Sequence, residues 1–276
     1  SIGVDVEVLT KWFNEPYYYY DKINSAEQKF DTIGEFLNSK NKDYYDFIHS
    51  HTFTFSQISD TGDGETPWNK LLSHFNVPSA YTVHSLDIHE ALTCKWTSTN
   101  YNYHKWVGEQ LQPVVFDSVN CIIQLTKTYK ELTEEMYPGK NYKYKSVIIP
   151  NGIILKNRYS KRTPNPSEIN MLYLGRFERR KGIYELCVAF GTLTKKYPNL
   201  KLHLVGSGQP RTPIPWFNRV DVETKVMKRI LKRGSVPSDR YVLHGVKRGT
   251  EKENIINDAD FVILPSYFET FCLVGL

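Results

Sequence analysis

Short apolar runs alternate with amphipathic segments along almost the whole chain. The runs are rich in β-branched residues, and the segments between them carry apolar side chains at helical spacing, as at Phe30, Ile33, Phe36 and Leu37. The pattern predicts strands at residues 4–9, 45–50, 80–84, 121–125, 146–149, 169–174, 202–205, 241–244 and 261–264. It predicts helices at residues 26–37, 68–75, 101–119, 127–136, 184–196, 223–232 and 252–259. Strands that alternate with helices predict an α/β protein with parallel sheets covered on both faces.

The alternation is interrupted once. Residues 156–167 are polar and include Pro164 and Pro166, a composition typical of a linker. A chain of 276 residues is long enough for two domains. We therefore expect a first domain at residues 1–152 and a second at 153–276, each a doubly wound, Rossmann-like parallel sheet.

Both domains are expected to be truncated. The first strand-like run begins almost at residue 1 with no Gly-rich turn before it. The last run is followed by only residues 265–276, and the chain ends inside an apolar segment, residues 272–276, which is expected to lead into a helix.

Composition narrows the class of protein. An apolar fraction of 40% and a charged fraction of 24% are typical of globular proteins, and the longest apolar runs are too short to span a bilayer. The cysteines at 94, 121, 187 and 272 lack metal-like spacing, which favours free thiols in a reducing compartment. The net charge of +5 fits an anionic ligand, an anionic membrane surface or a solvated basic face. We predict a cytoplasmic protein, with peripheral membrane contact as an alternative and no nucleic-acid partner.

A basic loop follows the predicted strand 169–174. Gly175 permits a tight turn, and Arg176 and Lys181 then lie at the carboxyl end of the sheet, where open α/β sheets bind ligands. The helix that begins next favours anions at its N-terminus. Arg and Lys together suit two phosphates, although a solvated basic loop is an equally good interpretation of these residues alone.

Two further strand ends carry polar or small residues. Gly206 and Gly208 form an isolated G-x-G, but Arg211 stands where a dinucleotide fingerprint needs its third glycine, so we reject an NAD site. Glu269 lies on the loop after the strand 261–264, before a predicted helix start, where a carboxylate can accept hydrogen bonds from sugar hydroxyls. The alternative is a Glu favoured in a first helical turn by the helix dipole.

Histidines end two strands of the first domain. His49 and His51 follow one apolar run, and His84 follows the next. A single structural histidine would be the default interpretation. Three histidines at one sheet edge favour a polar cleft.

Taken in order, these motifs resemble the retaining glycosyltransferases of family 4, which have the GT-B fold of two Rossmann-like domains facing a cleft. The matching segments are Gly-Arg-x5-Gly at 175–182 with Lys181, Leu-Val-Gly-Ser-Gly at 204–208, Leu-His-Gly-Val at 243–246, Ala-Asp at 259–260 and Glu-Thr-Phe at 269–271. In the first half, the His84 strand end and Val-Ile-Ile-Pro-Asn-Gly at 147–152 are similar to the same family. The resemblance covers nearly the whole chain, and the ordered set is more specific than any one motif.

The resemblance implies roles for particular residues. Arg176 and Lys181 would bind the donor diphosphate, with Gly206 in the same site. Glu269, matching the first Glu of a Glu-x7-Glu motif, and His84 would contact the donor sugar as catalytic residues. The remaining donor contacts would come from Val246 near the base and from the backbone of Phe271, Cys272 and Leu273. The second Glu of the motif is expected one residue past Leu276.

The reaction implied is transfer of a sugar from a UDP-, GDP- or ADP-linked donor to an acceptor hydroxyl, with retention of anomeric configuration. No cofactor and no metal are expected, and Asp258-Ala259-Asp260 is interpreted as a helix-to-strand turn because it precedes its strand. The acceptor stays open among a sugar, a sugar phosphate, a lipid and a glycan. The alternative function is a catalytically inactive nucleotide-sugar-binding or scaffold subunit of the same fold.

Overall fold

The computed structural model describes residues 5–11, 17–20, 28–51, 65–93, 98–153, 163, 165–208 and 222–275. The chain divides into two compact units, Ser1–Asn151 and Gly152–Leu276. The boundary expected from the sequence differs from this division by one residue. Each unit contains a four-stranded sheet in which all strands are parallel.

The sheet of the first unit has the order β4-β5-β6-β7. Its strands are β4 (Ile48–Ser50), β5 (Ser79–Val83), β6 (Cys121–Gln124) and β7 (Ser146–Ile148). The helices of this unit are α1 (Ile33–Asn38), α2 (Pro67–Phe75), α3 (Asp87–Thr93), α4 (Ser98–Trp106), α5 (Gln112–Ser118) and α6 (Lys127–Met136), with a 3-10 turn at Tyr142–Lys145. The predicted helix 127–136 is confirmed residue for residue.

The first described segments form a separate antiparallel sheet. Strands β1 (Val8–Lys11), β2 (Tyr17–Tyr20) and β3 (Gln28–Phe30) pair in that order. The predicted helix 26–37 was therefore wrong at residues 28–30, which form β3, and its residues 26 and 27 lie outside the described ranges. Helix α1 begins only at Ile33, because the Thr32 side chain accepts a hydrogen bond from the Glu35 N–H at 3.2 Å and caps the helix there.

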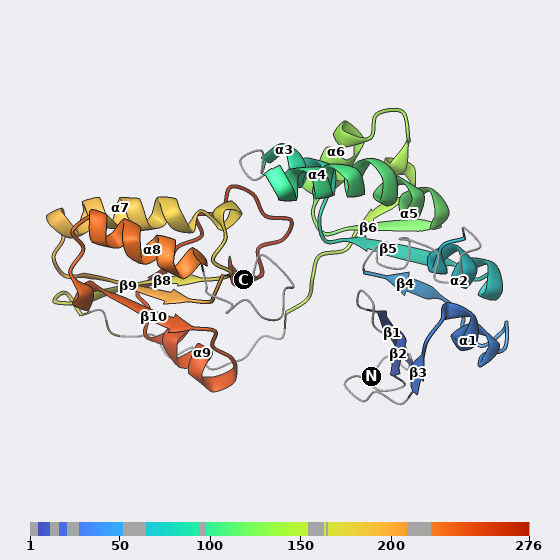
Figure 1. Ribbon diagram of the computed structural model, residues 1–276, viewed down its shortest axis with the longest axis horizontal. Helices are drawn as coiled ribbons and strands as arrows, with labels where there is room; N and C mark the ends of the chain where they lie inside the picture. The colour runs from blue at the N-terminus through green and yellow to red at the C-terminus, as the bar shows by residue number, and fades with distance from the viewer. Residues whose placement is uncertain are drawn as a thin grey trace. The chain divides into compact units, whose positions relative to one another are not determined.

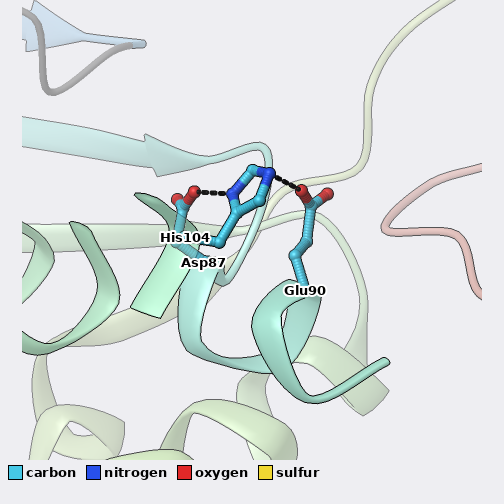
Figure 2. Close-up of side chains that lie close together, drawn as sticks. All are labelled: Asp87, Glu90 and His104. Atoms are coloured by element: carbon cyan, nitrogen blue, oxygen red, sulfur yellow. Dashed lines mark hydrogen bonds and ion pairs between the residues drawn. The ribbon is translucent and has the colours of Figure 1, made fainter. Parts of the chain in front are cut away.

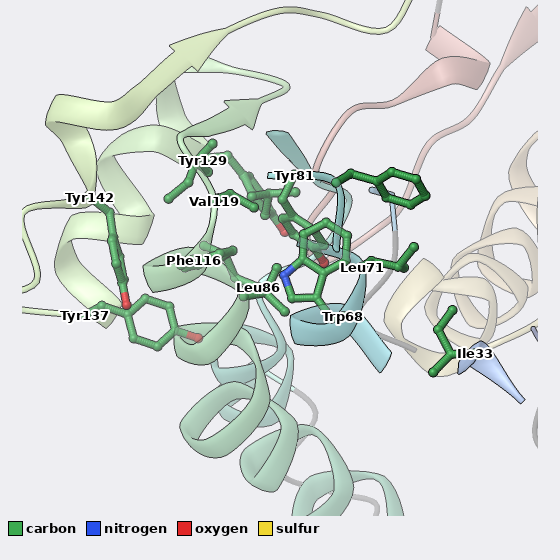
Figure 3. Close-up of a cluster of buried hydrophobic side chains, with 14 of the residues drawn as sticks. Ile33, Trp68, Leu71, Tyr81, Leu86, Phe116, Val119, Tyr129, Tyr137 and Tyr142 are labelled. Atoms are coloured by element: carbon green, nitrogen blue, oxygen red, sulfur yellow. The ribbon is translucent and has the colours of Figure 1, made fainter. Parts of the chain in front are cut away.

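An aromatic core fixes α5 on the sheet of the first unit (Figure 3). The Phe116 ring of α5 lies 5.7 Å from the Tyr81 ring of β5 and 5.2 Å from the Tyr142 ring. The Trp68 ring nitrogen of α2 donates to the Ser118 hydroxyl at 2.8 Å. Such aromatic pairs stabilise by about 0.5–1.5 kcal/mol each beyond the area they bury. The core therefore holds β5, the strand that His84 follows, firmly in place.

The long helix predicted at 101–119 is interrupted. Helix α4 continues into a π-helical segment, Val107–Leu111, before α5 begins. Pro113 explains the change, because a proline has no N–H to donate to the carbonyl four residues earlier. In the π-helical segment, Gly108 lies against α3: a Cβ at that position would be 2.4 Å from the Ile88 nitrogen.

The sheet of the second unit has the order β10-β9-β8-β11. Its strands are β8 (Ile169–Leu174), β9 (Leu200–Val205), β10 (Tyr241–Gly245) and β11 (Phe261–Val262). The helices are α7 (Ile183–Lys196), α8 (Val222–Arg233) and α9 (Gly249–Asn257). Figure 1 shows α7 and α8 over one face of this sheet and α9 on the other, the two-sided covering that the sequence predicts. The strand predicted at 169–174 is confirmed as β8.

In the turn between α9 and β11, the Asp260 side chain and the Asp258 backbone carbonyl both accept hydrogen bonds from Asn170. A carboxylate oxygen of Asp260 accepts from the Asn170 N–H at 2.7 Å, and the Asn170 side-chain amide donates to the Asp258 carbonyl at 3.3 Å. The segment joins a helix to a strand, as expected. None of the helices in the described ranges combines the length and apolar character needed to cross a membrane.

Two helical glycines of the first unit yield a matched stability prediction. Gly108→Ala should destabilise by about 1–3 kcal/mol, because its methyl group meets the Ile88 backbone. Gly34→Ala in α1 should stabilise by about 0.5–1 kcal/mol, because its methyl meets only Thr32 Oγ1 at 3.7 Å and alanine favours the helix. Urea unfolding of both variants measures the difference. A Gly108→Ala protein as stable as the parent would show that α3 does not contact the π-helical segment this closely.

Candidate functional site

The loops that follow three strands of the second unit are tied together at one edge of the sheet. The Gly175 N–H donates to the Val205 carbonyl at 3.0 Å, and the Phe177 N–H donates to the Ser207 carbonyl at 2.9 Å. The Gly206 N–H donates to the Gly245 carbonyl, also at 2.9 Å. Because the strands are parallel, their carboxyl ends meet at this edge. The three hydrogen bonds hold the loops side by side in the same order as the strands they follow.

Two glycines allow the loops to approach each other closely. Gly206 has φ of 141°, and a Cβ there would lie 1.8 Å from the Gly175 carbonyl oxygen. Gly182 has φ of 65°, and its Cβ would lie 2.0 Å from the Pro265 carbonyl oxygen. Any larger residue would force the backbones apart. The Tyr267 N–H donates to the Arg180 carbonyl at 2.9 Å, so the loop after β11 rests on the loop after β8.

This contact brings Lys181 and Glu269 together. The Lys181 ammonium donates to both oxygens of the Glu269 carboxylate, at 2.6 and 2.8 Å. The Ser266 hydroxyl donates to the same carboxylate at 2.6 Å. Burial alone would raise the pKa of Glu269, but the hydrogen bonds and charge of Lys181, the Ser266 bond and the charge of Arg180 outweigh it and lower the pKa. Glu269 is therefore ionised at neutral pH.

Arg176 belongs to a second charge cluster on the loop after β8. Its guanidinium lies 3.2 Å from the Glu178 carboxylate, and that of Arg180 lies 2.9 Å from the same carboxylate. Arg180 also stands over the Phe268 ring, 5.1 Å from its centre. The Arg176 side chain is 50% exposed, whereas that of Arg180 is 14% exposed. Arg176 is therefore more accessible to a ligand than Arg180.

A cavity of about 210 Å³ opens beside the ion pair. Five of the predicted site residues line it: Lys181, Glu269, Phe271, Cys272 and Leu273. The other lining residues are Tyr173, Leu174, Gly175, Leu264, Pro265, Ser266 and Val274. Arg176, Gly206 and Val246 do not line this cavity; Gly206 and Val246 lie at the ends of β9 and β10, where Val246 is 58% exposed.

The segment after Glu269 differs from the prediction. The expected helix N-terminus at residues 271–273 is a loop followed by one 3-10 turn, Leu273–Gly275. The Leu273 N–H donates to the Phe271 carbonyl at 3.0 Å, so in this conformation it is not free to point at a ligand. A local turn bond thus engages the Leu273 N–H, which the prediction left open.

In the first unit, the predicted histidines gather at the ends of β4 and β5. Nδ1 of His51 and Nε2 of His84 are 2.9 Å apart, and the two rings are stacked with centres 5.2 Å apart. The His49 ring lies 4.2 Å from that of His51, and its Nε2 is 2.7 Å from the Thr82 hydroxyl. Loss of solvent lowers the pKa of all three, and the neighbouring His51 ring lowers it further for His49 and His84. The cluster therefore favours neutral imidazoles at pH 7.

A buried glutamine holds the turn that follows His84. The Asp87 N–H donates to Oε1 of Gln112 at 2.9 Å, and the Gln112 amide donates to the Ser85 carbonyl at 2.7 Å. The Tyr137 hydroxyl lies 2.7 Å from the Gly108 carbonyl and 3.0 Å from Gln112 Oε1. Gln112 is fully buried. The backbone beyond His84 is thus fixed from α5 and α6.

A group of side-chain contacts joins α3 to α4 (Figure 2). His104 lies between two carboxylates, with Nδ1 at 2.6 Å from Asp87 and Nε2 at 3.4 Å from Glu90. Their ligand atoms lie within 4.8 Å of one another, close enough for a metal ion. In the described conformation each ring nitrogen of His104 faces its own carboxylate. We therefore interpret the group as a set of side-chain contacts through which His104 links the two helices.

Sequence reasoning missed three residues that shape these sites. Ser266 holds the Glu269 carboxylate, Glu178 partners Arg176, and Gln112 fixes the turn after His84. The Ser266 contact follows a spacing of three residues on a turn, which the sequence could have suggested. The buried position of Gln112 had no such local signal, because a glutamine at a helix start is ordinarily exposed.

A sequence model of a protein family matches most of the second unit. Residues 156–276, slightly less than half of the chain, match the sequence model of the family described as glycosyl transferases group 1. The matched segment contains Arg176, Lys181, Gly206, Val246 and Glu269.

Curated relatives extend the similarity into the first unit. Glycogen synthases of two Mycobacterium tuberculosis strains, CDC 1551 and H37Rv, are each 26% identical to the chain over 232 residues. The match covers 84% of this chain and 49% of those proteins. The chain thus spans about half the length of the curated relatives it matches.

Solved structures share the fold. The Anabaena protein HepE, in complex with UDP and glucose, superposes with a TM-score of 0.60 at 14% identity, covering 88% of this chain and 58% of HepE. TarM superposes with a TM-score of 0.59 at 15% identity, covering 94% of this chain and 44% of TarM. The pneumococcal O-GlcNAc transferase GtfA, in complex with UDP and GlcNAc, gives 0.55 at 19%, with coverages of 94% and 44%. The chain therefore has the GT-B fold, its residues 156–276 match the sequence model of glycosyl transferases group 1, and 84% of the chain is similar in sequence to part of two glycogen synthases.

Proposed function

We propose that the protein is a glycosyltransferase that moves a sugar from a nucleotide-sugar donor to an acceptor hydroxyl with retention of anomeric configuration. The observation that carries this proposal is the Lys181–Glu269 pair beside a cavity at the carboxyl edge of the second sheet. A cation there suits a phosphate, and a carboxylate suits sugar hydroxyls. A nucleotide-sugar needs both chemistries side by side.

The donor diphosphate is bound by Lys181 and Arg176 in this proposal. An ammonium group has three N–H donors, and two of those of Lys181 serve the Glu269 oxygens. The third is available to a phosphate oxygen without breaking the pair. The exposed Arg176 guanidinium has further donors beyond those directed at Glu178. As the bond from the anomeric carbon to the diphosphate breaks, these cations stabilise the charge that develops on the leaving phosphate.

In the front-face route that we propose for retention, the acceptor attacks from the face that the diphosphate leaves. The acceptor oxygen forms its bond to the anomeric carbon, and its proton passes to a leaving phosphate oxygen. Glu269 holds hydroxyls of the donor sugar, and neutral His84 contacts the sugar near the reacting carbon. None of these steps requires a metal ion or a cofactor, because side-chain cations perform the electrostatic task.

UDP is the nucleotide that we favour, ahead of GDP and ADP. The support is that HepE and GtfA, which share the fold, were solved with UDP. Similarity to glycogen synthases makes an α-glucan the first acceptor to test. A sugar phosphate, a lipid-linked acceptor and another glycan are the other acceptors to test in the same assay.

The function itself is tested by incubating the chain with UDP-, GDP- and ADP-sugars and an acceptor panel, and following nucleoside diphosphate release. We expect turnover with a UDP-sugar, and an α-linked donor should give an α-linked product by NMR. A β-linked product would rule out retention. Thermal stabilisation by the donor without turnover on any acceptor would instead support a nucleotide-sugar-binding subunit that is not an enzyme.

Removing the Lys181 cation should separate diphosphate binding from nucleoside binding. We predict that Lys181→Ala weakens UDP binding by roughly 1.5–3 kcal/mol, the range for a hydrogen bond to a charged group, while uridine binding stays unchanged. Isothermal titration of both ligands measures this. Lys195→Ala, at the exposed end of α7, is the matched control and should bind UDP like the parent. An equal loss of affinity for UDP and for uridine in Lys181→Ala would contradict the assignment of Lys181 to the diphosphate.

Neutralising Glu269 should have opposite effects on binding and on turnover. Glu269→Gln keeps the shape of the side chain but removes the charge that Lys181 neutralises, so UDP binding should be equal or tighter. The rate of sugar transfer should fall strongly, because an amide is a weaker partner for sugar hydroxyls. Glu168→Gln, which removes the carboxylate beside Lys201 elsewhere in the unit, is the control. Weaker UDP binding together with normal turnover would contradict the role given to Glu269.

A further inference from the structure

Glu178 pairs with two arginines of the loop after β8. The Arg176 guanidinium lies 3.2 Å from one oxygen of the Glu178 carboxylate, and the Arg180 guanidinium donates a hydrogen bond to the same oxygen at 2.9 Å. The Glu178 N–H also donates to the Arg176 carbonyl at 3.1 Å, so a backbone turn keeps these two residues together. One carboxylate is thus shared by two cations.

The two ion pairs of Glu178 differ in their surroundings. The Arg180 side chain is 14% exposed, and its guanidinium also stands over the Phe268 ring. The Arg176 side chain is 50% exposed, and an ion pair that faces water is weakened by the solvent. The contact of Arg176 is therefore the easier one to exchange for another anion. Arg180 can keep the Glu178 charge compensated when Arg176 turns away.

The charge of Glu178 also reaches the wall of the candidate donor site. Tyr173 lines the cavity, and its hydroxyl donates to the Arg176 carbonyl at 2.7 Å. Burial raises the pKa of Tyr173, and the charge of Glu178 raises it further. Burial likewise raises the pKa of Glu223, in the first turn of α8, and Glu178 adds to that shift. A phosphate that approaches Arg176 therefore meets a carboxylate that already pairs with it.

We propose that Glu178 competes with the donor diphosphate for Arg176: the carboxylate acts as an internal anion, and the diphosphate displaces it while Arg180 keeps Glu178 neutralised. The proposal rests on the function proposed above, in which Arg176 binds that diphosphate. Such competition lowers the affinity for every nucleoside diphosphate, including the product. A transferase must release this product after each turnover, and Glu178 takes Arg176 back at that step.

Glu178→Gln tests the competition, because glutamine keeps the size of the side chain and removes its charge. Isothermal titration measures UDP binding to the parent, to Glu178→Gln, to Arg176→Ala and to the double variant. We expect Glu178→Gln to bind UDP about two- to fivefold more tightly than the parent, the range for a surface ion pair. In the Arg176→Ala background the same change should leave the affinity unaltered, because the carboxylate then has no Arg176 to hold.

Glu168→Gln is the matched control for loss of a paired carboxylate. Glu168 lies 3.5 Å from Lys201 and precedes β8, whereas Arg176 follows that strand. UDP affinity should stay at the parent value in this variant. Misfolding of Glu178→Gln cannot imitate the expected result, because a damaged site binds more weakly, not more tightly.

Two results would overturn the competition, whatever the turnover. One is unchanged or weaker UDP binding in a folded Glu178→Gln protein. The other is an equal gain with and without Arg176, which would mean that the carboxylate acts on a different cation. Absence of turnover in the parent, with the Arg176-dependent gain present, would instead refute the proposed transferase and leave the competition established.

Discussion

The close approach of two loops at Gly182 is the constraint on which the candidate donor site depends. Only a residue without a Cβ allows the loop after β8 to pass within contact of the Pro265 carbonyl. That approach sets Lys181 against Glu269, although 88 residues separate them in the chain. Parallel pairing of β8 with β11 supplies the framework, because it brings the carboxyl ends of both strands to one edge. The two charged groups stabilise each other. Lys181 keeps the Glu269 carboxyl ionised, and Glu269 holds the Lys181 ammonium beside the cavity.

The first unit has the same arrangement of parallel strands but carries different side chains at the strand ends. Parallel strands β4 and β5 end side by side, and their ends carry imidazoles instead of an ion pair. Low pKa values keep these rings neutral, so they suit hydrogen bonding to an uncharged sugar better than they suit pairing with a phosphate. Their support comes from buried polar contacts, above all those of Gln112, and from the aromatic core beneath β5. The candidate donor site is thus charged, whereas the histidine cluster of the first unit is neutral.

The sequence predicted what depends on local periodicity and on order along the chain. Helix α6 and strand β8 match their predictions residue for residue, because each has a clear hydrophobic period and polar boundaries. The errors occurred where tertiary contacts or single residues override the period. Thr32 delays α1, Pro113 interrupts the long helix, and turn bonds replace the helix expected after Glu269. Lys181 and Glu269 were each predicted as site residues, but their contact was not, since it depends on loops that pack together only in three dimensions.

The account's central claim is that the second unit binds a donor diphosphate through Lys181 while Glu269 remains beside it for the sugar. A crystal structure of the chain with UDP-glucose tests this most directly. The account predicts a phosphate oxygen within hydrogen-bond distance of the Lys181 ammonium, the Arg176 guanidinium turned toward the same diphosphate, and the Glu269 carboxylate on a glucose hydroxyl. A diphosphate bound away from the carboxyl edge of β8, or one held there without contact to Lys181, would contradict it.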